Sequence, residues 1–134
     1  MKNRFFNKPI GNVYTKPSAK SDLSTQILYG EKFKIISINK NWLKIKTSFD
    51  NYIGFIKKNT FIKSFHPTHK IFTSKSKIYK KIKSNFIKTK EDIYFSSNIQ
   101  SLKYEKGYIK FDKNMWLKTS DIKRINHIEK NYKK

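Results

Sequence analysis

Few side chains in this sequence could carry covalent or acid–base chemistry. The 134 residues include no cysteine, three histidines and nine acidic residues. The lack of cysteine excludes a disulfide framework, a cysteine-ligated zinc site and a cysteine nucleophile on this chain. His66 and His69 have a spacing that metal ligands can use, but no cysteine or carboxylate lies nearby to complete a tetrahedral site, so we interpret them as linker histidines. The sequence therefore predicts no catalytic residue, no metal and no cofactor.

Basic residues outnumber acidic ones by 31 to 9, which gives a net charge of +22. Such a charge is typical of proteins that bind nucleic acid or another polyanion. Only Arg4 and Arg124 are arginine, however, and lysine, isoleucine and asparagine increase together in genomes rich in A and T. Recognition of guanine and phosphate favours the forked guanidinium of arginine. We therefore expect no specific nucleic-acid partner.

The densest basic run extends from Lys75 to Lys83, with the aromatic residues Phe72, Tyr79 and Phe86 close to it in sequence. An oligonucleotide-binding barrel combines lysines and stacking aromatics in this way. A basic β-barrel that binds nucleic acid or another polyanion through its lysine-rich surface is thus the alternative function.

The apolar pattern predicts short strands. Residues 32–38, 42–47 and 52–56 alternate apolar and polar side chains or are β-branched, and turns rich in asparagine or aspartate separate them. No apolar run is long enough for a membrane span, and residues 1–12 do not form a secretory signal. We expect an all-β fold with little helix, no membrane association and a cytoplasmic location.

The second half of the sequence repeats the first in outline, which predicts two tandem small barrels. The matched segments are Val13-Tyr14 with Ile78-Tyr79, residues 27–33 with 93–99, Trp42 and Ile45 with Tyr108 and Phe111, and Gly54-Phe55-Ile56 with Met115-Trp116-Leu117. In the second copy, the loop that corresponds to Asp50 and Tyr52 is five residues shorter.

The expected organisation has five parts. Residues 1–9 are an N-terminal extension, 10–63 a first barrel, 64–69 a linker, 70–125 a second and divergent barrel, and 126–134 a linker towards a catalytic domain that this chain lacks. The boundary between the barrels is placed at Pro67, because proline ends a strand pattern and holds the preceding residue extended.

A spaced motif covers residues 17–55. Its members are Pro17, Ser18, Ser21, Leu23, Gln26, Leu28, Gly30, Glu31 and Phe33, then Trp42 and Ile45, and then Asp50, Tyr52, Gly54 and Phe55. This pattern resembles the bacterial SH3 domain that precedes the catalytic domain in NlpC/P60-type cysteine peptidases. The resemblance covers residues 10–62 well, and the second half fits a second such domain more loosely.

The resemblance implies a role without catalysis. Enzymes of this family cut γ-D-glutamyl to diamino-acid bonds in murein stem peptides with a Cys-His-His constellation, which a chain without cysteine cannot supply. We therefore expect a substrate-recognition and scaffold module whose partners are the murein stem peptide and an NlpC/P60 catalytic domain, in cis or in trans. The expected setting is the recycling of murein fragments.

The resemblance also implies which residues hold the substrate. An acidic residue and a tyrosine of the first SH3 domain bind the free amino terminus of the stem peptide, and by motif position these are Glu31 and Tyr52. An ammonium group only donates hydrogen bonds, so a carboxylate and a hydroxyl oxygen suit it. The alternative is that Glu31 is a solvated strand residue and Tyr52 an amphipathic barrel residue.

Asp50 and Trp42 are further candidates for the rim of this site. Asp50 is interpreted chiefly as the turn former of its loop, because aspartate readily bonds the backbone two residues on. Trp42 has the opposite parity from Leu43 and Ile45, which are expected to point into the barrel together with Phe33 and Ile35. It is either a stacking surface for a ligand or a half-buried lid over the barrel mouth.

Overall fold

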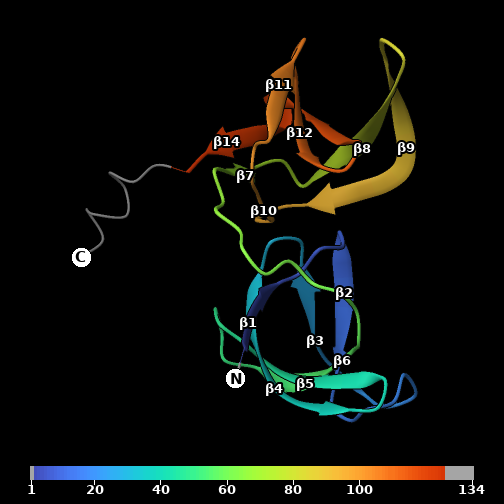
Figure 1. Cartoon of the computed structure of the whole chain (residues 1–134), viewed down its shortest axis with the longest axis vertical. Coiled ribbons are helices and arrows are strands. Elements are labelled where there is room, and N and C mark those ends of the chain that lie inside the picture. The colour runs from blue at the N-terminus through green and yellow to red at the C-terminus, as the bar shows by residue number, and fades with distance from the viewer. Residues whose placement is uncertain (1, 126–134) are drawn as a thin grey trace, which may run out of the picture. The chain divides into compact units, whose positions relative to one another are not determined.

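The computed structural model describes residues 2–125, which form two compact units that divide between Phe65 and His66. Both units are built from antiparallel strands (Figure 1). Within the described residues there is no α-helix, and the single helical element is the 3₁₀ turn η1 (Thr119–Asp121). The prediction of an all-β fold with little helix is confirmed. No helix in residues 2–125 is long and apolar enough to cross a membrane.

Unit 1 consists of one six-stranded sheet that curls into a barrel (Figure 1). Its strands are β1 (Lys2–Phe5), β2 (Ile10–Tyr14), β3 (Leu23–Leu28), β4 (Lys32–Asn39), β5 (Trp42–Thr47) and β6 (Ile53–Lys57). Their order in the sheet is β1-β4-β5-β6-β2-β3.

The core of unit 1 follows the two-residue alternation of its strands. Phe33 in β4 and Leu43 and Ile45 in β5 are buried, and Ile35 packs half-buried against them, as the sequence predicts. The other buried members are Phe6, Val13, Ile27, Ile56 and Phe61. Trp42 is half-buried on the opposite face of β5.

The barrel closes where β2 meets β6, at the single residue pair Tyr14 and Phe55. A Cβ atom on the neighbouring Gly54 would lie 2.6 Å from Val13 Cγ1 and 2.7 Å from the carbonyl oxygen of Tyr14. Both distances are shorter than van der Waals contact. Only glycine allows the two strands to approach this closely.

The residues expected to form an N-terminal extension are part of the barrel. Residues 2–5 of β1 pair with residues 32–35 of β4, and Phe5 exchanges backbone hydrogen bonds of 2.9 and 3.2 Å with Ile62. Phe65 packs its ring 5.2 Å from that of Phe5. The sequence does not reveal this strand because it has only four residues, two of them basic.

Unit 2 has eight short strands in two sheets. They are β7 (His69–Ile71), β8 (Lys75–Ile82), β9 (Asn85–Tyr94), β10 (Asn98–Ile99), β11 (Lys103–Glu105), β12 (Tyr108–Asp112), β13 (Met115–Lys118) and β14 (Ile122–Arg124). The sheet orders are β11-β12-β13-β8-β9 and β10-β7-β14. Its largest buried side chains include Ile71, Ile78, Ile93, Ile99, Phe111, Trp116 and Leu117.

Strand order and several contacts recur in the two units. The order β4-β5-β6-β2-β3 in unit 1 corresponds to β11-β12-β13-β8-β9 in unit 2. The closing pair of unit 2, Tyr79 and Trp116, has the same place as Tyr14 and Phe55. Phe6 exchanges backbone hydrogen bonds with Gly30 and Glu31 in unit 1, as Ile71 does with Ser96 and Ser97 in unit 2, all of them 2.8 to 3.0 Å long.

The ends of the units differ in part from the expected domain limits. His69, expected at the end of a linker, begins β7 and pairs with both Ile99 and Arg124. The predicted linker 126–134 lies outside the described residues.

Several tight turns use residues other than glycine in the left-handed backbone region. Gly30 and Gly107 have positive φ angles of 78° and 85°. The residues other than glycine with positive φ are Lys40, Asn51, Lys83, Ser96, Lys106 and Asn114.

Replacing Gly54 by alanine tests the closing contact. We expect Gly54→Ala to lower the free energy of unfolding by about 1 to 3 kcal/mol, the usual cost of overpacking, because the methyl group meets the backbone of β2. Urea denaturation measures the loss. Lys57→Ala, at an exposed position of the same strand, is the control with little expected effect. Equal free energies of unfolding for the two variants would contradict the close approach of β6 to β2 at Gly54.

Candidate functional site

Glu31 is held by the turn that joins β3 to β4. Gly30 adopts the left-handed conformation there, and the backbone N–H of Glu31 donates to the carbonyl oxygen of Leu28 at 3.1 Å. The side chain folds back over the turn, so that the N–H of Leu28 donates to Oε1 of Glu31 at 3.1 Å. The carboxylate is therefore fixed in position and half-buried.

Thr47 organises the loop that carries Asp50 and Tyr52. Its side chain is fully buried at the end of β5. Its hydroxyl group donates to Oδ1 of Asp50 at 2.5 Å and accepts from the backbone N–H of Tyr52 at 3.0 Å. Both candidate residues of the loop are thus anchored to one hydroxyl group.

The loop lies next to the turn of Glu31 because β4 and β5 are paired. Phe33 is opposite Thr47 in the register, and the N–H of Ser48 donates to the carbonyl oxygen of Lys32 at 3.0 Å. The carboxylate of Asp50 is close enough to act electrostatically on Glu31. The structure therefore brings Glu31 and Asp50 together, with Tyr52 on the same loop.

The pKa of Glu31 is raised above its usual value of 4.5. Burial is the main cause, and the negative charge of Asp50 adds to it, while the hydrogen bond from the Leu28 backbone acts in the opposite direction. In the described part of the chain, ion pairs involve Asp92 and Glu105, and none involves Glu31 or Asp50. Within residues 2–125, these two neighbouring carboxylates therefore form no ion pair, although the protein has 31 basic residues.

Two aromatic side chains of the same loop face solvent. Tyr52 is 47% exposed and Phe49 is 90% exposed. An exposed phenylalanine next to an acidic pair offers apolar contact area for a ligand. Phe49 was not predicted as a site residue, because nothing in its spacing separates it from a core phenylalanine. Thr47 was also missed, although it shares the parity of Leu43 and Ile45.

Trp42 lies apart from this group. It begins β5 while Thr47 ends it, and five residue steps along a strand correspond to about 17 Å. Its ring meets that of Tyr14 edge to face, with 5.8 Å between the centroids, and both line a separate hollow of about 450 Å³. The structure therefore does not place Trp42 on the rim around Glu31.

Unit 2 lacks the acidic pair. Ser97 has the backbone contacts of Glu31 and is buried. The loop of Asp50 and Tyr52 has no counterpart, because β12 ends at Asp112 and β13 begins at Met115. Within residues 2–125, the arrangement of Glu31, Asp50 and Tyr52 occurs in unit 1 alone.

The aromatic residues near the basic run of unit 2 largely pack on one another. Tyr79 is buried, and Phe86 stacks on Tyr108 with 4.1 Å between the ring centroids. Lys77 pairs with Asp92, and Lys81 pairs with Glu105. Of the three aromatics considered for base stacking, Phe72 alone is exposed, so this surface does not offer a stacking platform.

The two spaced histidines have other contacts. Nδ1 of His69 lies 2.7 Å from the hydroxyl of Thr68, and the backbone N–H of His66 donates to the side chain of Gln100. Residues 2–125 contain no group of three or more histidine, aspartate or glutamate side chains that could hold a metal ion.

The family of unit 1 follows from its sequence together with this barrel. Residues 13–60 match the family model described as the bacterial dipeptidyl-peptidase SH3 domain. The match covers 48 of the 134 residues, all of them in unit 1. The matched range contains Glu31, Asp50 and Tyr52, together with the closing contact at Gly54. The predicted resemblance to a bacterial SH3 domain is confirmed for this range.

A solved structure has the same fold as the present chain. It is an NlpC/P60 family protein from Bacillus cereus ATCC 10987, which matches 93% of the chain with a TM-score of 0.70 and 12% sequence identity. The present chain spans 57% of the length of that protein. Comparison with curated proteins gives no significant match.

The raised pKa of Glu31 predicts a stability change with a defined sign. Because the folded state binds the Glu31 proton more tightly, wild-type stability falls as the pH rises through 4.5 and the raised pKa. Glu31→Gln removes this penalty and keeps an acceptor for the N–H of Leu28. We expect a higher melting temperature than wild type at pH 7 and a difference that closes below pH 4.5. A melting temperature below wild type at pH 7 would contradict the prediction.

Thr47→Val tests the hydroxyl group that anchors the loop. Valine keeps the volume but leaves the N–H of Tyr52 and the carboxylate of Asp50 without this partner. We expect a loss of about 1 to 3 kcal/mol in urea denaturation, together with faster amide exchange in residues 48–52. Thr25→Val, at a half-buried position in β3, is the matched control. Unchanged exchange in the loop would rule out the anchoring role.

Proposed function

We propose that the chain is the substrate-recognition and scaffold part of an NlpC/P60-type endopeptidase that cuts γ-D-glutamyl to diamino-acid bonds in murein stem peptides. The SH3 domain of unit 1 binds the free amino terminus of the stem peptide through Glu31 and Tyr52. The catalytic step belongs to an NlpC/P60 domain with a cysteine nucleophile, in cis or in trans. A role in murein recycling in the cytoplasm accompanies this proposal.

The observation that carries the proposal is the acidic pair without a basic partner. Glu31 is half-buried and fixed by a backbone hydrogen bond, while Asp50 adds negative charge beside it. A ligand ammonium group would neutralise this charge, donate to the Glu31 carboxylate and find a second acceptor in the Tyr52 hydroxyl. Asp50 then acts through the local field, and the exposed ring of Phe49 offers apolar contact to the peptide.

We further propose that unit 2 is a second, diverged SH3-like barrel with a scaffold role. The shared strand order, the matched pair of Tyr79 with Trp116 and the turn at Ser96 support it. Because Ser97 replaces the acidic residue and the second loop is missing, unit 2 offers no site for an ammonium group of the same kind.

The proposal is tested by fusing the chain to an NlpC/P60 catalytic domain and comparing stem peptides with a free and an acetylated amino terminus. Glu31→Gln and Tyr52→Phe each remove a hydrogen bond to a charged group, which corresponds to a loss of about 10- to 100-fold in kcat/KM on the free peptide. On the acetylated peptide, which wild type should process poorly, the variants should differ little from wild type.

Matched substitutions control for charge and ring chemistry. Glu91→Gln and Tyr104→Phe change exposed residues of unit 2 and should leave kcat/KM within twofold of wild type on both peptides. Equal rates on free and acetylated peptides, or wild-type rates in Glu31→Gln and Tyr52→Phe, would reject the recognition role.

A further inference from the structure

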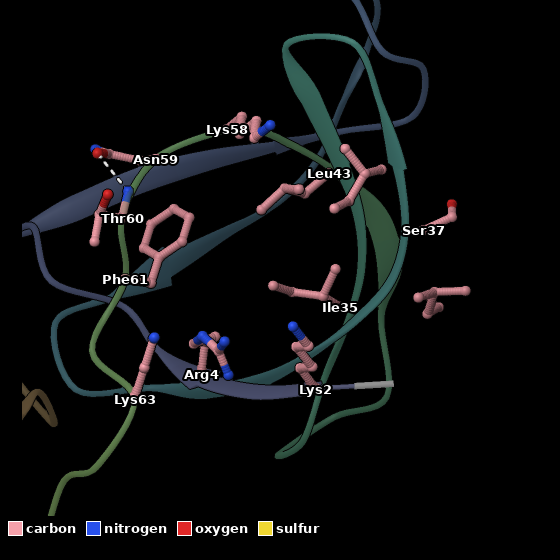
Figure 2. A pocket seen from close by; sticks show the side chains of 12 residues that line it. Lys2, Arg4, Ile35, Ser37, Leu43, Lys58, Asn59, Thr60, Phe61 and Lys63 are labelled. Atoms are coloured by element: carbon pink, nitrogen blue, oxygen red, sulfur yellow. Dashed lines mark hydrogen bonds between the residues drawn. The ribbon is translucent and has the colours of Figure 1, made fainter.

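A second hollow in unit 1, which we call the basic hollow, differs in chemistry from the acidic pair. Its volume is about 540 Å³, within the range of small-molecule sites in proteins. The ionisable residues that line it are Lys2, Arg4, Lys58 and Lys63, and no acidic residue lines it. Figure 2 shows these side chains around a set of apolar ones.

The floor of the basic hollow is apolar. Ile35 of β4, Leu43 of β5 and Phe61 lie between the basic side chains (Figure 2). Leu43 and Phe61 are also buried members of the barrel core, so the floor is part of that core. Ile38 extends the apolar surface at the edge and is 62% exposed, which is unusual for isoleucine unless something covers it.

The backbone register places three of the cations along one wall. Lys2 and Arg4 alternate on β1 and therefore point to the same face. The pairing of Phe5 with Ile62 brings the next residue, Lys63, alongside Arg4. Figure 2 shows the nitrogen atoms of Lys2, Arg4 and Lys63 in a row on this side.

These charges have no protein counter-charge in the described part of the chain. No ion pair in residues 2–125 involves Lys2, Arg4 or Lys63, and the guanidinium group of Arg4 donates a hydrogen bond to the carbonyl oxygen of Asn3 at 2.7 Å. Genome composition explains many exposed lysines. It does not explain why one of two arginines and two lysines converge by register beside an apolar floor.

We propose that the basic hollow binds a small amphiphilic anion, meaning a carboxylate, sulfonate or phosphate attached to an apolar body. The head lies against Lys2, Arg4 and Lys63, and the body covers the half-buried Ile35 and the exposed Ile38. A nucleic acid fits less well, because its charges repeat along the strand and the single aromatic ring of the floor is buried. This site is independent of the ammonium site at Glu31, since it selects the opposite charge.

The test uses the fluorescent probe 8-anilinonaphthalene-1-sulfonate with the folded 134-residue chain. We expect one probe molecule per chain, binding that weakens with added salt, and weaker binding of the uncharged analogue N-phenyl-1-naphthylamine. Dodecanoate should displace the probe, whereas dodecanol should displace it at least several-fold less well. If the chain binds anionic lipid vesicles but does not bind free dodecanoate, it recognises a membrane surface, and the proposal is overturned.

Two double variants separate the hollow from general charge. Arg4→Gln with Lys63→Gln should weaken probe binding about tenfold, because each exposed charge pair contributes a few-fold. Lys34→Gln with Lys46→Gln removes the same charge from exposed positions outside the hollow and should change affinity less than twofold. Equal weakening in both double variants would reduce the binding to nonspecific attraction and reject the proposal.

Backbone amide chemical shifts of the wild-type chain give a readout that does not depend on variant folding. Adding the probe should shift amides of residues 2–5, 35–38 and 58–63 first. Shifts centred elsewhere, or no saturable shifts, would overturn the assignment of the site.

Discussion

The absence of a side chain at Gly54 is the constraint on which unit 1 depends. A single β-carbon there would overlap Val13 and the backbone of Tyr14, so the barrel can close between β2 and β6 only with glycine. The loop from Thr47 to Tyr52 leads directly into β6, and its position therefore follows from that closure. The turn of Glu31 is fixed from the other side, by its hydrogen bonds to Phe6. The pairing of β4 with β5 then brings the loop of Asp50 next to the turn of Glu31.

One small barrel carries two charged clusters of opposite sign. Glu31 stands immediately before β4, whereas Ile35 and Ile38 farther along the same strand belong to the basic hollow. The acidic pair is held by backbone and threonine hydrogen bonds, which fix a carboxylate without neutralising it. The basic wall is positioned by strand register, and Arg4 also donates a hydrogen bond to the carbonyl oxygen of Asn3. Neither group forms an ion pair within the described residues. Each can therefore attract a ligand of opposite charge.

The sequence predicted the barrel core correctly, because alternating apolar residues in a strand point to one face and pack together. The alternation of Phe33, Ile35, Leu43 and Ile45 predicted the core. Sequence reasoning did not predict the strand Lys2–Phe5. This strand forms because it pairs with residues 32–35, and its own residues show no strand pattern. The motif singles out Glu31 and Tyr52 as candidates, which stays a prediction, and it could not show that Trp42 stands at the other end of β5 from Thr47. The basic hollow combines segments from three parts of the chain, so no local pattern reveals it.

Lysine and asparagine residues in the tight turns affect how many further substitutions this protein can tolerate. Lys40, Lys83 and Lys106 adopt a backbone conformation that costs a residue with a β-carbon roughly 1 kcal/mol or more, and glycine would remove that cost. If AT-rich codons brought these lysines in, mutation pressure has reduced thermodynamic stability without changing the acidic pair or the basic hollow. A protein in this condition tolerates fewer further substitutions before it unfolds. The same turns are accordingly the first positions at which evolution, or a protein engineer, can restore that tolerance.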